Sequence, residues 1–122
     1  MLKRRENISR ILRTLPREKA FYFFTSIGNY TGESASSLKE FMEKINEVNL
    51  KSLEFHLHRG DFEKWIAEVL EDNELAEEIG KLQKLNLTGD VLRNRLYSIV
   101  SKRHAFLLNQ ARQARFYFPH SK

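Results

Sequence analysis

The chain has 122 residues, no cysteine and a formal net charge of +5. This length is typical of a single domain, and the lack of cysteine excludes disulfides, thiol catalysis and cysteine-ligated metal. The opening Met-Leu-Lys-Arg-Arg lacks the apolar run of a signal peptide, and no stretch approaches the roughly 20 apolar residues of a membrane span. We therefore expect a cytoplasmic protein with no membrane partner.

The charge is arranged in three blocks along the chain. Residues 1–19 carry seven Lys or Arg and two Glu, for a net charge of +5. Residues 20–101 carry nine basic and fourteen acidic side chains, and residues 102–122 carry five basic side chains and no acid, for net charges of −5 and +5. Basic ends on a small protein favour contact with phosphate. We interpret residues 1–122 as one domain, an acidic body with a basic extension at each end.

The N-terminal block is predicted to form an amphipathic helix. Its apolar residues recur at the spacing of one helix face, and basic residues occupy the other face. The apolar residues are Ile8, Ile11, Leu12 and Leu15. Pro16 ends this helix because proline cannot donate to the helical hydrogen-bond ladder, and it suits the first turn of a second helix.

Residues 20–27 are apolar nearly throughout, so their periodicity does not separate a buried helix from a buried strand. No partner strand is visible elsewhere in the sequence, and we therefore favour a helix. Residues 28–35 are predicted to form a loop, in which Gly28 and Gly32 supply turn geometry.

Helix-capping residues divide the acidic body into short helices. Ser37 and Glu40 form a capping box ahead of an apolar stripe that begins at Leu38. Asn49 is predicted to cap a short helix that Gly60 closes. The later predicted caps are Asp61, then Asp72 or Asn73, then Thr88.

The last predicted helix runs from Thr88 to about Arg115, which makes it roughly 40 Å long. A domain of this size does not cover a helix of that length, so its distal end is expected to project. The predicted fold class is all-α, a compact multi-helix domain with a basic N-terminal helix and a long basic C-terminal helix.

One stretch of the body carries a recognisable pattern. It reads Ser52-Leu53-Glu54-Phe55-His56-Leu57-His58-Arg59-Gly60-Asp61-Phe62-Glu63-Lys64-Trp65-Ile66, followed by Glu74-Leu75-Ala76 and preceded by Ser37-Leu38-Lys39-Glu40-Phe41. The pattern resembles an uncharacterised family of small archaeal and bacterial domains over about residues 20–103. The resemblance implies a fold unit without a known reaction. The family's longer His-containing insert is reduced here to His58-Arg59-Gly60, and both basic ends lie outside the resemblance.

The cluster around His56 and His58 has the residue types of a metal site, with Glu54 and Asp61 nearby. Zinc needs three or four convergent ligands, and two histidines at i and i+2 point to different faces of a helix. We therefore predict no metal and no cofactor. We expect instead that His56 is half-buried and hydrogen-bonded to backbone, and that Asp61 caps a helix.

Acidic side chains are numerous near Glu71, Asp72 and Glu74, but they lie beside lysines on predicted helix faces. Acid–base catalysis needs two carboxyl groups in a cleft with pKa values pushed apart. A solvated helix surface is the simpler interpretation. We therefore predict that the protein is not an enzyme and has no small-molecule substrate.

The basic ends carry the functional prediction, a non-enzymatic RNA-associated factor with the ribosome as its large partner. Arg grips phosphate bidentately, and adjacent aromatic rings stack on unpaired bases. The predicted nucleic-acid-binding residues are Lys3, Arg4, Arg5, Arg10, Arg13, Arg17, Lys102, Arg103, Arg112, Arg115, Phe116 and Tyr117. Shape is expected to dominate over sequence readout, because no base-reading module is recognised.

The alternative prediction is a homo-oligomeric protein-interaction or regulatory module. In this hypothesis the basic ends dock on the acidic body of another subunit. A homodimer that exchanges its terminal helix would bury Ile8, Ile11, Leu12 and Leu15 across a two-fold axis.

Overall fold

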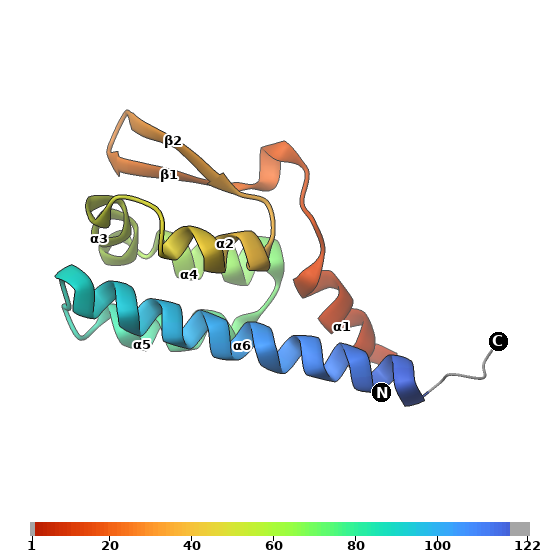
Figure 1. The fold of residues 1–122 in the computed structure, drawn as a ribbon. Coiled ribbons are helices and arrows are strands. Elements are labelled where there is room, and N and C mark those ends of the chain that lie inside the picture. Colours follow the sequence, from red (N-terminus) through yellow and green to blue (C-terminus); the bar gives the residue numbers. More distant parts are fainter. Residues whose placement is uncertain (1, 118–122) are drawn as a thin grey trace.

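The computed structural model describes residues 2–117, with side chains for residues 7–113, and its longest element is helix α6 (Gly89–Tyr117). Figure 1 shows α6 running along one side of the molecule, with α5 (Asn73–Gln83) beside it. Helices α2 (Leu38–Ile45), α3 (Leu50–Arg59) and α4 (Asp61–Trp65) form a middle layer. Helix α1 (Leu2–Leu12) packs along the distal part of α6. Within residues 2–117, no helix combines the length and apolar character needed to cross a membrane.

A β-hairpin covers α2 and α3, so the all-α prediction is wrong and the fold is α+β (Figure 1). Strand β1 (Phe21–Ser26) pairs antiparallel with β2 (Asn29–Ala35), where a helix over 20–27 and a loop over 28–35 were expected. A short 3-10 turn, η1 (Arg17–Lys19), follows Pro16 and leads into β1.

Local chemistry explains why this segment forms strands. Residues 21–24 are all aromatic, and aromatic side chains fit the pleated, half-buried surface of a sheet better than a helix. The chain reverses between Ser26 and Asn29, where Gly28 has a φ of +85° that glycine adopts without strain. Strand β2 is polar and contains Gly32, so its sequence carries no alternation that would announce a partner strand.

The inner face of the hairpin closes a single hydrophobic core. Phe21 and Phe23 are buried and lie edge to face, with ring centroids 4.9 Å apart. Their rings also contact Phe41 of α2 and Phe62 of α4. The buried apolar side chains form one cluster that extends from Ile8 of α1 to Leu107 of α6. Both ends of the chain therefore share a core with the acidic body.

Most predicted helix boundaries are confirmed. The Glu40 N–H donates to Ser37 Oγ at 3.1 Å, and the Glu40 carboxylate accepts from the Ser36 N–H at 2.7 Å. Asn49 accepts from the Lys51 N–H at 2.8 Å at the start of α3. Gly60 closes α3 with a φ of +81°. Asp72 caps α5, as described below for the site.

His56 fastens the hairpin to α3. Its Nε2 accepts from the Phe24 N–H at 2.8 Å, and its Nδ1 donates to Asp61 Oδ2 at 2.8 Å. Burial lowers the pKa of His56 and outweighs the Asp61 carboxylate, which raises it. The ring is therefore neutral, with its proton on Nδ1, and the Nε2 lone pair accepts the hydrogen bond from the Phe24 N–H of β1. The predicted bond from His56 to backbone is confirmed.

The predicted cap at Asp61 is wrong. Its carboxylate accepts from His56 and also from Arg59 Nε at 3.0 Å, and no side chain caps the start of α4. The Asp61 carboxylate accepts a hydrogen bond from the His56 imidazole instead of capping the start of α4. Asp61 therefore fixes the tautomer that lets His56 bind the strand.

We predict that His56→Ala lowers the free energy of unfolding at pH 7.5 by about 2–3 kcal/mol, because it leaves the Phe24 N–H without its acceptor and Asp61 with Arg59 as its remaining partner. The difference from the wild type should shrink as the pH falls. The unfolded chain binds the imidazole proton at its ordinary pKa of 6.5, whereas the native state binds it only at a lower pH. The stabilisation is complete above pH 6.5 and is lost as the pH falls from 6.5 toward the native pKa.

Urea unfolding followed by circular dichroism at several pH values measures this difference. His58→Ala is the matched control, because His58 lies on the same helix and is exposed. It should change the free energy of unfolding by less than about 0.5 kcal/mol. Equal effects of the two substitutions would contradict the role assigned to His56.

Candidate functional site

The two basic blocks, which lie at opposite ends of the sequence, meet at one end of the molecule. Helix α1 runs beside the distal part of α6 in the opposite direction, so its first residues lie near the last turns of α6 (Figure 1). Ile8 and Ile11 of α1 are buried in the same cluster as Leu107 of α6. We call this end, made of α1 and residues 102–117, the basic pole. Opposite chain directions bring the first and last charge blocks side by side.

The basic pole unites predicted residues from both blocks. Their positions on the helices are Lys3, Arg4, Arg5 and Arg10 in α1, and Lys102, Arg103, Arg112, Arg115, Phe116 and Tyr117 in α6. Arg13 follows α1 and Arg17 belongs to η1. The side chains of Lys3, Arg4, Arg5, Arg115, Phe116 and Tyr117 lie outside the described part of the structure. For these six residues only the helix that carries them is established.

Arg10 and Arg13 fasten α1 to the body. The Arg10 guanidinium pairs with Glu71, and both side chains remain about half exposed. This carboxylate raises the pKa of Arg10, and the guanidinium lowers the pKa of Glu71. Arg13 donates to the Val69 carbonyl at 2.9 Å, within the π-helical turn η2 (Ile66–Leu70). These two cations connect α1 and the residue that follows it to the end of η2.

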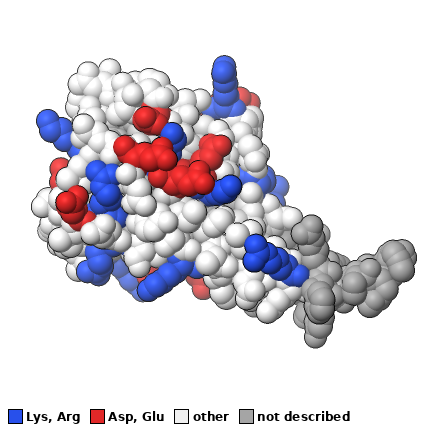
Figure 2. Space-filling view, in the orientation of Figure 1, with Lys and Arg blue, Asp and Glu red and all other residues white. Residues whose placement is uncertain are grey.

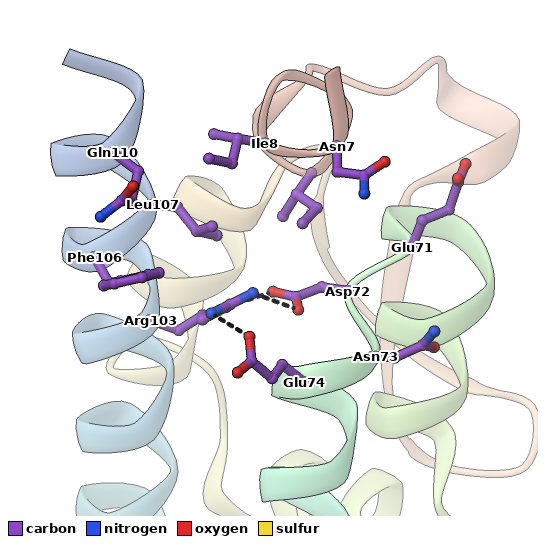
Figure 3. Close-up of a pocket in the computed structure, with 11 residues that line it drawn as sticks. Asn7, Ile8, Glu71, Asp72, Asn73, Glu74, Arg103, Phe106, Leu107 and Gln110 are labelled. Carbon is purple, nitrogen blue, oxygen red and sulfur yellow. Dashed lines mark hydrogen bonds and ion pairs between the residues drawn. The ribbon is translucent and has the colours of Figure 1, made fainter. Parts of the chain in front are cut away.

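Arg103 is the centre of a second, more buried network, which Figure 3 shows. Its Nε and one terminal nitrogen donate to the two carboxylate oxygens of Asp72, both at 2.9 Å. The other terminal nitrogen lies 2.9 Å from Glu74 Oε1. The Arg103 side chain is only 17% exposed, and the Asp72 side chain is 1% exposed. All three guanidinium nitrogens are thus occupied by acids of the same chain, which leaves Arg103 no fork for an external phosphate.

Asp72 serves two helices at once. Its Oδ1 also accepts from the Leu75 N–H at 3.2 Å, which confirms it as the cap of α5. Burial alone would lower the pKa of Arg103, but its hydrogen bonds and attraction to Asp72 and Glu74 raise that pKa overall. The preceding residue, Glu71, has a φ of +67° and turns its own carboxylate toward α1. The junction of η2 and α5 therefore binds both α1 and α6.

A pocket of about 440 Å³ opens at this junction. Figure 3 shows its walls on α1, on the start of α5 and on α6, with Phe106 beside Arg103. The Arg103 guanidinium lies 5.5 Å from the centroid of the Phe106 ring. Three carboxylates line the pocket against one guanidinium, so it repels phosphate. We assign the pocket to the structural junction and not to nucleic-acid contact.

Lys102, Arg112 and Arg17 differ from the cations of the junction. All three are exposed, and none pairs with an acid among residues 7–113. Figure 2 shows acidic side chains gathered near the centre of one face, where α2 lies, and basic side chains spread around that face and along the edge of the molecule. Lys102 and Arg112 are therefore exposed cations of the basic pole, and Lys102 lines a pocket with Glu74 and Glu78.

His56 is occupied by structural hydrogen bonds. Both ring nitrogens of His56 are engaged by Phe24 and Asp61, so neither can move a proton or bind a metal without breaking the fold. Among the described side chains, no three His, Asp or Glu residues come close enough to hold a metal ion.

Comparison with protein-family models places the chain. A family of unknown function, DUF5752, matches residues 16–122. The chain belongs to this family. The predicted resemblance to an uncharacterised family of small domains is thus confirmed. No curated protein and no solved structure matches the chain.

The extent of the DUF5752 match corrects one expectation. The basic C-terminal block was expected outside the resemblance, but it lies inside the matched residues. The N-terminal helix α1 remains outside, because the match begins at residue 16. The basic pole therefore combines a segment that the DUF5752 model includes with one that it does not.

Sequence reasoning assigned Asp72 only a capping role and Arg103 only a phosphate role. The two residues are 31 positions apart, and no local spacing signals a pair at that separation. The exposed rings of Tyr22 and Tyr30 were also missed, because their signal is an alternation that becomes visible only once residues 21–35 are recognised as a hairpin.

We predict that Arg103→Ala lowers the free energy of unfolding by about 3 kcal/mol, because it leaves the buried Asp72 carboxylate without its partner. Lys102→Ala, which removes an exposed charge from the adjacent position, should change it by less than about 0.5 kcal/mol. Chemical denaturation measures both values. A destabilisation by Arg103→Ala no larger than that of Lys102→Ala would show that the junction is not a structural centre.

Proposed function

We propose that this protein is a non-enzymatic, RNA-associated factor that binds phosphate backbone through its basic pole, with the ribosome as its large cytoplasmic partner. The observation that carries the proposal is the packing of α1 on the distal part of α6. The basic residues of α1 and those of residues 102–117 then share one end of the molecule, although a body with a net charge of −5 separates them in the sequence. A concentrated positive pole attached to an acidic body orients the protein toward a polyanion.

We divide the basic residues into two groups by their contacts and propose a different role for each. Arg10, Arg13 and Arg103 have partners within the chain and hold the pole in shape. The proposed phosphate contacts are Lys3, Arg4, Arg5, Arg17, Lys102, Arg112 and Arg115. Phosphate contacts position a protein on nucleic acid without reading its sequence, so we expect binding to depend on shape and charge. We also predict that the rings of Phe116 and Tyr117 stack on unpaired bases at the same pole.

The rival hypothesis, a homo-oligomer built by exchange of the terminal helix, has less support. Ile8 and Ile11 are already buried against α6 of their own chain. Several acids of the body also have cationic partners in the same chain, among them Glu33, which pairs with Lys44 at 2.7 Å. The helix and the acids are thus satisfied without a second copy.

We predict that replacing Arg4, Arg5, Arg112 and Arg115 together by Ala weakens duplex RNA binding at least tenfold in about 0.1 M salt. Each lost phosphate contact removes up to about 0.9 from the slope of log affinity against log salt, so the slope should fall by about 3. Fluorescence anisotropy with a labelled RNA duplex across a salt series measures both quantities. Retention on purified ribosomal particles, which should also be lost, identifies the large partner.

The matched control removes four exposed lysines from the body, Lys51, Lys64, Lys81 and Lys84. It lowers the net charge by the same amount but leaves the basic pole intact. Its salt slope should stay close to that of the wild type. Equal losses in the two variants would show that only net charge matters, and no binding by the wild type at low salt would overturn the proposed function.

A further inference from the structure

We propose that the outer face of the β1–β2 hairpin is a stacking platform for unpaired nucleic-acid bases. This inference rests on the proposed function, because it adds a single-strand site to a protein proposed to bind RNA phosphate. It names the part of the RNA that the body would contact while the basic pole binds backbone.

A row of aromatic rings occupies this face. Phe21 and Phe23 point into the core, so the alternation of β1 turns Tyr22 and Phe24 outward. Tyr30 of β2 joins them, with its ring centroid 5.8 Å from Tyr22 and 5.4 Å from Phe24. Tyr22 is 37% exposed and Tyr30 is 48% exposed. Tyr22 and Tyr30 thus present π surface to solvent, and the partly buried Phe24 packs beside them on a strand pair that the core holds in place.

The face carries no charge that would repel nucleic acid. Within Phe21–Ser26 and Asn29–Ala35 the one charged residue is Glu33. Its carboxylate lies 2.7 Å from Lys44 Nζ of α2, which neutralises it. The remaining side chains beside the rings are small and uncharged, so a base can approach each ring without displacing an ion pair.

Cations lie next to the ring row and link it to the basic pole. The Tyr22 hydroxyl donates to the Arg17 carbonyl at 2.6 Å, which fixes η1 against this ring. Arg17 and Lys19 are both exposed. The segment that joins α1 to β1 carries Arg17 and Lys19, with Glu18 between them, and runs from the basic pole to the hairpin in Figure 1. A ligand that follows this path meets positive charge first and then exposed rings.

This order of charge and rings matches single-stranded RNA. Its phosphates are attracted by the cations, and its unpaired bases stack on aromatic side chains without a requirement for sequence. A duplex keeps its bases stacked on one another, so it can use the basic pole but not the rings. An apolar protein partner would form no ion pairs with the adjacent cations, Arg17 and Lys19.

The test compares three versions of the full chain on two ligands, a labelled twelve-nucleotide oligouridine and a twelve-base-pair RNA duplex. The versions are the wild type, Tyr22→Ala with Tyr30→Ala, and Tyr22→Phe with Tyr30→Phe. Stacking on one aromatic side chain changes affinity by about five- to 150-fold per base. We expect the alanine pair to weaken oligouridine binding at least tenfold and to leave duplex binding within twofold. The phenylalanine pair, which keeps both rings, should bind oligouridine within about threefold of the wild type.

Ile27→Ala is the matched control, because Ile27 is 82% exposed at the tip of the same hairpin but has no ring. It should leave both affinities unchanged, and circular dichroism should show the same melting transition for every version. A wild type that binds duplex while the alanine pair binds oligouridine normally would overturn the platform and leave the proposed function standing. Absence of any RNA binding by the wild type would overturn both. A wild-type dimer in light scattering that the alanine pair converts to a monomer would assign this face to protein contact and overturn the platform.

Discussion

The pairing of Asp72 with Arg103 is the interaction on which the arrangement of the helices depends. One buried carboxylate caps α5 and accepts two hydrogen bonds from α6. Its neighbour Glu71, turned by a left-handed backbone, holds α1 through Arg10. Two consecutive acids at the end of η2 therefore fix three helices relative to one another. A buried carboxylate that has lost its cation is strongly unfavourable, so this geometry resists rearrangement.

The same junction holds α1 and the distal part of α6 together, and so brings the basic residues of both helices to one end of the molecule. The cations nearest the junction, Arg10 and Arg103, form ion pairs with acids of the same chain, whereas Lys102 and Arg112 remain exposed. A count of Lys and Arg in a sequence block thus overstates the charge that an external ligand meets. Such a count also does not distinguish the cations that are paired within the chain from the exposed cations that an external ligand could contact. DUF5752 membership covers α6 but not α1, so half of this pole lies outside the family match.

Local signals in the sequence predicted local structure well. The capping box at Ser37 and Glu40 and the caps at Asn49 and Asp72 are correct because each joins residues within three positions. The hairpin was missed because both faces of Phe21–Ser26 read as apolar and β2 has no alternation of its own. The partners of Arg103 and the bond between His56 and Phe24 join residues about 30 positions apart, which only the folded chain reveals. For the candidate site, charge blocks indicated which segments matter but not that α1 and α6 lie together.

Amide hydrogen exchange, measured with and without bound RNA, would reveal which helices contact the RNA. We propose that α1 and the distal part of α6 form one phosphate-binding surface. RNA should therefore slow exchange in residues 2–12 and in residues 102–117 together, at the same RNA concentration, while α5 is unaffected. Protection of only one of these segments, or protection centred on the acidic helices of the body, would contradict the account.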